Sequence, residues 1–472
     1  MRTTPAVGIW PALLRGALFA AVVVPVLARG GYLPASRVLF VFLAAAALLA
    51  AVACDPDAAR RIAASPAVLL LIGLSALGAL SATWSIVPAS ETLRWAAVVT
   101  GYAAVAIAAG VEVAVSGRVR FLAAGLAALA AVVGLSGLYG AAMFTEPFAD
   151  RIGGTWRAGG TLEYPPALGL LEVSALPILV VGMTRKSRPA LSILAAATAA
   201  VAGASLGLTG SRTQTFLAAC VLGAAVVWPQ RTVRAPRSLV AAACALIAGA
   251  AVAATVVADG QASARTAASS GRLVGLLGIV LLAAAAWAVV RRSYAALRER
   301  SHPRLRRGIA ALALLLLAAP ATLAAFASAG DPRSTDFTHG RVEQWDDAAR
   351  TAWERPLVGT GADSFFAATE RYQDTAPTRF AHNLPLELSV ELGVVGLALT
   401  LALYAAGARA VWAARASWAG WLLAPAVLAF LATNLIDWPW HLAGSGAVWA
   451  AALGGLIAAG ALARAPTRRR PS

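Results

Sequence analysis

The residues best suited to chemistry lie in one polar stretch, from about Ser328 to Asn383, between two hydrophobic segments. His382 directly precedes a predicted helix start, which Pro385 marks because proline is favoured in a first helical turn. A neutral imidazole at this place can act as a general base near pH 7. The alternative for His382 is a histidine that caps or packs the helix start.

Two arginines stand where a charged side chain near hydrocarbon needs a partner. Arg212 lies in a very short polar turn between two hydrophobic segments. A charge there is costly unless it pairs or binds an anion, and a planar guanidinium suits a phosphate. Snorkelling to the interface is the alternative for Arg212. Arg341 opens an amphipathic run through Trp353, and we expect it near Glu343 or Asp347. An ordinary surface ion pair is the alternative for Arg341.

Four further polar residues are candidates for supporting roles. Arg157 precedes two glycines in a polar loop and is a candidate substrate ligand, with plain loop structure as the alternative. Glu172 is the one acidic residue well inside a hydrophobic run, where we expect it to line a cavity or pair with an arginine. Asn383 follows the candidate base. Asp437 stands in a turn whose tryptophans are typical of a membrane interface.

Hydrophobic helices must position these residues. The chain has 472 residues, of which 60% are hydrophobic and only 13% are charged. Soluble domains carry about 25% charged residues, so this composition indicates a polytopic membrane protein. We therefore predict an all-α membrane fold with about 12–14 transmembrane helices and one large extracytoplasmic loop.

Runs long enough to cross the bilayer as helices support this count. They fall roughly at 13–28, 37–53, 66–82, 93–111, 119–143, 164–182, 191–208, 213–228, 239–257, 273–290, 309–326, 384–404, 420–436 and 443–462.

The formal net charge of +17 follows these runs rather than marking a nucleic-acid surface. With the N-terminus inside the cell, most arginines fall in loops on the cytoplasmic side, where they contact membrane lipids. We expect a multi-pass protein of the cytoplasmic (inner) membrane with both termini in the cytoplasm and the active site outside. Its predicted parts are a bundle of spans over 1–327, an extracytoplasmic loop with short amphipathic helices over 328–383, and C-terminal helices with a basic tail over 384–472.

Metal and nucleotide chemistry have no support in the sequence. None of the predicted outer segments has the His, Cys or Asp spacing typical of metal ligands, and no phosphate-binding nucleotide loop occurs. We expect no metal, no cofactor and no nucleic-acid partner.

The order of these motifs resembles the O-antigen ligase and polymerase superfamily of bacterial envelope glycosyltransferases. The similarity rests on the segments Gly340–Trp345, Pro356–Gly361, Ala381–Asn383, Glu391–Gly396, Gly210–Thr213, Arg157–Pro166 and Asp437–Trp440. Tyr164–Pro166 departs from the pattern, because members often have an asparagine there.

The resemblance implies a helical membrane fold and a transfer reaction. The transfer moves a glycan from a polyprenyl diphosphate, such as undecaprenyl diphosphate, to an acceptor hydroxyl, without a metal or a nucleotide sugar. By position, it implies that His382 is the base and that Arg212 and Arg341 bind the diphosphate. The acceptor is a glycan, a lipid or a protein, and the choice between ligase and polymerase stays open.

Two functions of other classes remain open at this point. A secondary transporter or lipid flippase of the polysaccharide pathway would show inverted repeats with acidic residues at corresponding mid-span positions. Glu172 has no such counterpart in the sequence. A non-catalytic partner in envelope assembly would be recognised because the purified protein would not turn over lipid-linked glycan.

Overall fold

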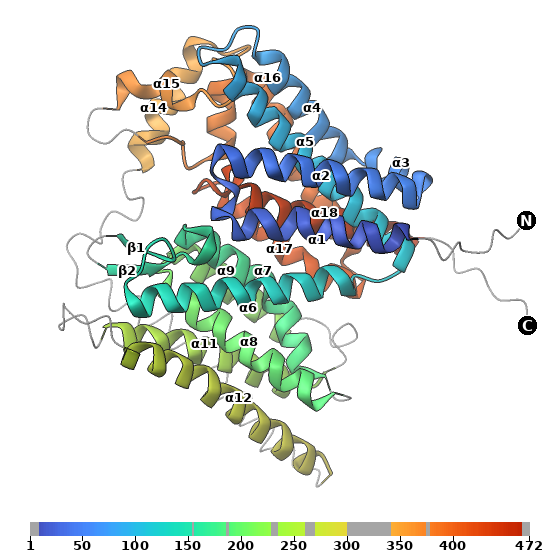
Figure 1. Cartoon of the computed structure of the whole chain (residues 1–472), viewed down its shortest axis with the longest axis vertical. Coiled ribbons are helices and arrows are strands. Elements are labelled where there is room, and N and C mark those ends of the chain that lie inside the picture. The colour runs from blue at the N-terminus through green and yellow to red at the C-terminus, as the bar shows by residue number, and fades with distance from the viewer. Residues whose placement is uncertain are drawn as a thin grey trace, which may run out of the picture. The chain divides into compact units, whose positions relative to one another are not determined.

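The regular structure is almost entirely helical (Figure 1). The computed structural model describes residues 9–152, 155–185, 188–227, 235–259, 270–299, 341–373 and 378–464. Within these ranges, β1 (Ala149–Ile152) and β2 (Thr155–Ala158) form a two-stranded antiparallel hairpin. The predicted all-α fold is confirmed.

The chain packs into two compact units, the first formed by Met1–Leu122 with Gly340–Ser472 and the second by Ala123–His339. The first unit contains α1 (Trp10–Leu27), η1 (Arg29–Gly31), α2 (Pro34–Cys54), α3 (Pro56–Ala63), α4 (Pro66–Ser81), α5 (Ala89–Ser116), α14 (Arg341–Glu354), α15 (Phe365–Thr369), η4 (Glu370–Tyr372), α16 (Leu384–Ala414), α17 (Trp418–Thr433), η5 (Pro439–His441) and α18 (Ala443–Arg464). The second contains most of α6 (Arg120–Met143), the hairpin, η2 (Gly160–Leu162), α7 (Pro165–Thr184), α8 (Pro189–Leu208), α9 (Arg212–Val227), α11 (Arg237–Asp259) and α12 (Ser270–Glu299).

The helices match the predicted spans closely. Among the described residues, 10 helices are long and apolar enough to cross a membrane, and the bent pair α3–α4 makes up to 11. The shorter apolar helices α9 and α17 have the same character. Each predicted span corresponds to one of these helices, except the run at 309–326, which lies outside the described residues. The multi-pass membrane character is thus confirmed.

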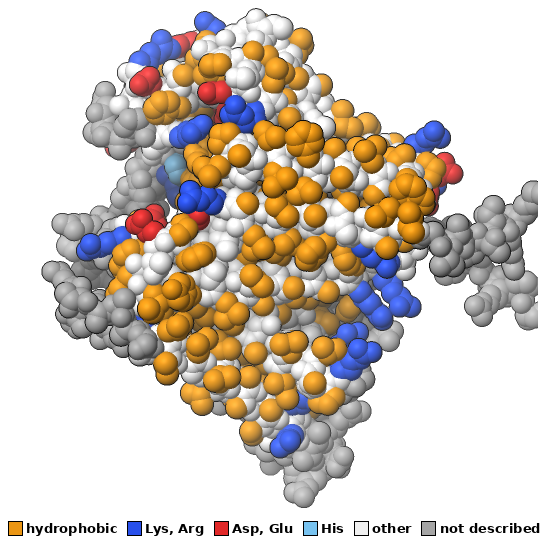
Figure 2. Space-filling view, in the orientation of Figure 1, with side chains coloured by type: hydrophobic (Ala, Val, Ile, Leu, Met, Phe, Trp, Pro, Cys, Tyr) orange, Lys and Arg blue, Asp and Glu red, His pale blue; other side chains and the backbone are white. Residues whose placement is uncertain are grey.

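Small residues set the packing in the first unit. A Cβ atom on Gly454 of α18 would lie 1.9 Å from the carbonyl oxygen of Ala106 in α5. A Cβ on Gly446 would lie 2.2 Å from the Tyr102 ring. Glycine at both positions lets the two helices approach closely, as helices in lipid do. Figure 2 shows hydrophobic side chains spread over the sides of the helices, with Lys and Arg gathered toward helix ends.

Connections between helices of the first unit meet at the end where α14 and α15 lie, away from α3 (Figure 1). The Ile86 amide donates to the Thr360 carbonyl at 3.0 Å, and the Leu384 amide donates to the Asn434 carbonyl at 2.8 Å. At the other end, Arg15 pairs with the buried Glu112. This alternation agrees with the predicted topology, in which these connections share one side. The identity of that side stays a prediction.

Candidate active site

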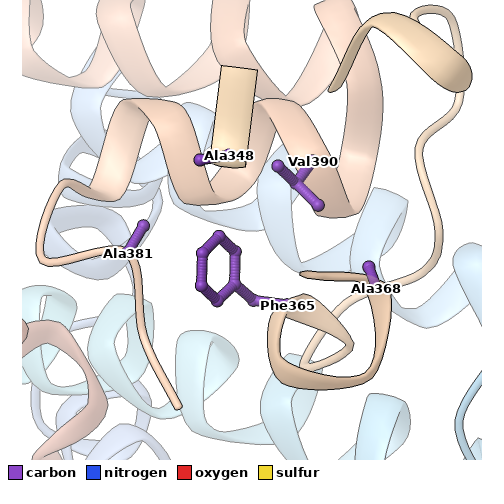
Figure 3. Close-up of a cluster of buried hydrophobic side chains, with 5 residues drawn as sticks. All are labelled: Ala348, Phe365, Ala368, Ala381 and Val390. Atoms are coloured by element: carbon purple, nitrogen blue, oxygen red, sulfur yellow. The ribbon is translucent and has the colours of Figure 1, made fainter. Parts of the chain in front are cut away.

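A small hydrophobic cluster holds the polar segment against the start of α16. α14 forms over the predicted amphipathic run, and its Ala348 is fully buried, whereas Trp353 is 81% exposed. Figure 3 shows Phe365 at the centre of the cluster, surrounded by Ala348, Ala368, Ala381 and Val390. These contacts fix α14, α15 and the residues before α16 as one body.

The backbone of the motif 356–361 forms hydrogen bonds with the backbone of α16 around the motif 391–396. Helix α16 is broken at Gly393 (φ 63°, ψ −158°), which frees backbone groups near the break. Three hydrogen bonds join the segments: Thr360 N to Val390 O (3.0 Å), Gly361 N to Glu391 O (2.8 Å) and Val394 N to Pro356 O (2.7 Å). Gly359 has a φ of 66°, and a Cβ there would lie 2.4 Å from the Glu391 carbonyl. Only glycine allows this approach.

His382 lies just before the start of α16 and adopts the left-handed backbone conformation, with a φ of 52°. Its Nδ1 atom lies 3.1 Å from the Phe380 carbonyl oxygen. Since a carbonyl only accepts, Nδ1 carries the proton and Nε2 keeps a lone pair. Asn383 caps α16, because its Oδ1 accepts from the Leu386 amide at 3.0 Å. Its Nδ2 donates to the Leu435 carbonyl at 3.0 Å, which anchors this helix start.

The surroundings of His382 favour the neutral imidazole. Burial lowers the pKa of His382 from its ordinary value of 6.5. The charges of Asp437 and Glu387 raise the pKa of His382, while that of Arg341 lowers it. Because burial is the largest of these effects, the ring is neutral at pH 7 and able to accept a proton at Nε2.

Arg341 reaches across to the connection between α17 and α18. Its guanidinium lies 3.7 Å from Asp437 Oδ2, and the two side chains are 22% and 6% exposed. The sequence-based expectation named Glu343 or Asp347, and the observed ion pair corrects it. Residues two positions apart on a helix do not share a face, so Glu343 is poorly placed for Arg341. The structure thus brings Arg341, Asp437 and His382 together.

Two buried residues, His441 and Glu387, lie next to the segment that carries His382, and sequence reasoning did not select Glu387. His441 Nε2 pairs with Glu387 Oε1, and the side chains are 3% and 2% exposed. The other oxygen of Glu387 accepts from the Ala381 amide at 3.0 Å. The Phe380 ring stacks on His441 with centroids 4.0 Å apart. The sequence did offer a signal for Glu387, because an acidic residue in the first turn of a membrane helix indicates a functional candidate.

A second buried pair joins α2 to the motif before α15. Arg37 is 6% exposed, and one of its nitrogens lies 3.9 Å from Asp363 Oδ2. Another donates to the His441 carbonyl at 3.3 Å. Burial raises the pKa of Asp363, against the charges of His441 and Arg37. Glu391 Oε1 accepts from the Phe365 amide at 3.1 Å and so holds α15. Sequence reasoning missed Arg37 and Asp363 as well, although an arginine at the start of a hydrophobic run marks a functional candidate.

The second unit brings Arg157 and Arg212 together. Arg157 lies on β2, opposite Asp150, and Arg212 begins α9. A Cβ on Gly210 would lie 3.2 Å from Arg157 Nε, so the hairpin contacts the turn before α9. Burial lowers the pKa of Arg157, and the charge of Arg212 lowers it further. Two guanidinium groups that repel each other beside a helix N-terminus favour an anion.

Glu172 makes a contact between helices of the second unit. It is fully buried in α7, and its Oε1 accepts from Ser205 Oγ of α8 at 3.1 Å. A Cβ on Gly134 of α6 would lie 2.6 Å from the same oxygen. The observed partner is therefore a serine, in place of the expected arginine or open cavity.

Comparison with known families adds one match. Residues 262–401 match the family described as O-Antigen ligase. The predicted resemblance to the O-antigen ligase and polymerase superfamily is confirmed. No curated protein matches the chain.

The O-antigen ligase match covers Arg341, both glycine-containing motifs, His382 and Glu387. Arg157, Arg212 and Asp437 lie outside the matched range. Across the described residues, no three His, Cys, Asp or Glu side chains are grouped as metal ligands. The acidic side chains around His382 face arginines and a histidine instead.

Proposed function

We propose that this protein transfers a glycan from a polyprenyl diphosphate carrier to an acceptor hydroxyl on the outer side of the cytoplasmic membrane. The O-antigen ligase match and the many apolar helices support a membrane ligase or polymerase of envelope polysaccharide. The observation that carries the finer proposal is the contact of His382 Nδ1 with the Phe380 carbonyl, which leaves Nε2 to accept a proton, close to the ion pair of Arg341 and Asp437.

The reaction we propose is a single displacement. Nε2 of His382 takes the proton from the acceptor hydroxyl while the hydroxyl oxygen forms a bond to the anomeric carbon of the donor glycan. The bond between that carbon and the diphosphate oxygen breaks, and the electron pair leaves with the diphosphate. Such a displacement inverts the configuration of the anomeric carbon.

Arginines are the proposed ligands of the leaving diphosphate. Arg341 supplies a partly exposed guanidinium in the first unit, and Asp437 orients it. Arg157 and Arg212 are the proposed diphosphate ligands of the second unit. Guanidinium groups form paired, charge-assisted hydrogen bonds with phosphate oxygens, and such bonds strengthen as negative charge develops on the leaving group.

The transporter alternative has less support because of the environment of Glu172. An acid on a substrate path faces a water-filled cavity. Glu172 is instead fully buried, bonded to Ser205 and packed against Gly134.

Reconstitution tests the proposed function. The purified protein in lipid nanodiscs, given an undecaprenyl diphosphate-linked glycan and a hydroxyl acceptor, should release undecaprenyl diphosphate and form the glycosylated product. Addition of EDTA should leave the rate unchanged, because the proposed site uses arginines and a histidine. A protein that is folded but yields no product would contradict the proposal, and so would abolition of transfer by EDTA.

A further inference from the structure

The backbone just before α16 is held at several points by buried and half-buried side chains. Residue 381 is fixed from both sides: its amide donates to Glu387 Oε2 at 3.0 Å, and its carbonyl accepts from Trp345 Nε1 at 3.0 Å. The Phe380 ring stacks with the rings of both His441 and Trp438. This restraint falls on the two residues that precede His382.

Glu387 and His441 form the centre of the restraint. Both oxygens of Glu387 are in use, one on His441 and the other on the Ala381 amide. The carbonyl of His441 in turn accepts from Arg37. With exposures of 3% and 2%, neither His441 nor Glu387 can contact a glycan or a diphosphate. Any effect of the pair on the reaction must pass through a neighbour.

The backbone of His382 explains why such a restraint is needed. A histidine with a φ of 52° lies in a region that residues with a Cβ atom adopt at a cost. The segment keeps this conformation only if the surrounding structure imposes it. The bond between His382 Nδ1 and the Phe380 carbonyl depends on the same conformation, since both groups lie within the restrained segment.

We propose that Glu387 and His441 are positioning residues, which hold residues 380–382 so that His382 keeps its proton on Nδ1 and presents Nε2 to the acceptor. The inference rests on the proposed function of His382 as the base. Three charged groups act on the His382 ring, namely Glu387 on α16, Arg341 on α14 and Asp437 before α18. Replacing Glu387 by glutamine therefore removes both a hydrogen-bond acceptor and one of the two charges that raise the pKa of His382.

The test compares Glu387→Gln, His441→Gln and the double variant in nanodiscs, with Glu343→Gln as the matched control on the exposed face of α14. Each single variant should lower kcat roughly 10–100-fold, the range expected when a reactive group loses its support. The KM for the lipid-linked donor should stay within about twofold, as expected when ground-state binding is kept. The double variant should lose less than the product of the two single losses, because the two residues are bonded to each other and hold the same segment.

A second readout does not depend on transfer. Diethyl pyrocarbonate modifies neutral imidazole, so the rate of His382 modification against pH, followed by mass spectrometry, reports the pKa of His382. In Glu387→Gln the midpoint should move to lower pH, whereas Glu343→Gln should leave it unchanged. An unchanged midpoint, or a fall in donor binding equal to the fall in kcat, would overturn the positioning role. A shifted midpoint in a protein that transfers no glycan would show that Glu387 acts on His382 and would refute the proposed function.

Discussion

Replacing Gly359 by alanine should separate the motif 356–361 from the break in α16. Gly359 has a φ of 66°, and an added Cβ would lie 2.4 Å from the carbonyl carbon and oxygen of Glu391. A left-handed conformation costs a residue with a Cβ atom about 1–2 kcal/mol. Relieving the clash requires the two backbone segments to move apart. This movement breaks the hydrogen bonds of the Thr360 and Gly361 amides, and each lost bond costs about 0.5–1.5 kcal/mol.

These costs add to roughly 2–5 kcal/mol of local stability. Amides that exchange through local opening should then exchange roughly 30-fold to several thousand-fold faster, because about 1.4 kcal/mol corresponds to a factor of ten. Hydrogen exchange with mass spectrometry on peptides that cover 355–362 and 390–396 measures this change. Gly16→Ala in α1, where an added Cβ meets nothing within 4 Å, is the matched control. Protection in Gly359→Ala equal to that of the wild type would refute the proposed contact between the motifs.

Three further predictions address charge, pH and topology. Arg341→Ala and Arg212→Lys should each weaken transfer strongly with normal membrane insertion, because alanine lacks the charge and lysine lacks the planar fork. The control Arg350→Lys, on the exposed face of α14, should not weaken transfer. Near-full activity of Arg341→Ala and Arg212→Lys would indicate that these arginines do not bind diphosphate. Since burial lowers the pKa of His382 and only the neutral ring accepts a proton, the transfer rate should decline at low pH with a midpoint below pH 6.5. A decline centred above pH 6.5 would contradict this. A reporter that is active only outside the cytoplasm should be active when fused after Asp374 and silent when fused after Arg300, and the reverse result would put His382 on the wrong side.

The helices were predictable because each hydrophobic run has to satisfy its backbone internally in lipid. The helix start at α16 was predictable for a similar local reason, since Asn383 is a favoured cap and Pro385 a favoured first-turn residue. These signals lie within a few positions of one another in the sequence, where periodicity and composition can detect them.

The contacts around His382 were not predictable in the same way. Glu387 and His441 are 54 positions apart, and Arg37 contacts a carbonyl 404 positions away. No local pattern encodes which of several acidic residues will face Arg341, so the choice of Asp437 over its own helix neighbours came only with the fold. The sequence did not predict the break of α16 at Gly393, for a different reason. Its hydrophobic run continues unbroken through the turn, so hydropathy alone predicts one straight helix.

The central claim is that His382 removes the proton from the acceptor hydroxyl, and single-turnover transfer by purified His382→Ala tests it most directly. With donor and acceptor saturating, the rate should fall about 10²–10⁴-fold, which is roughly 3–5 kcal/mol of barrier. Binding of the lipid diphosphate donor, measured on the same preparation, should stay nearly intact, because arginines hold the diphosphate. Transfer by His382→Ala at the wild-type rate would contradict the account, and so would a loss of transfer that donor binding alone explains.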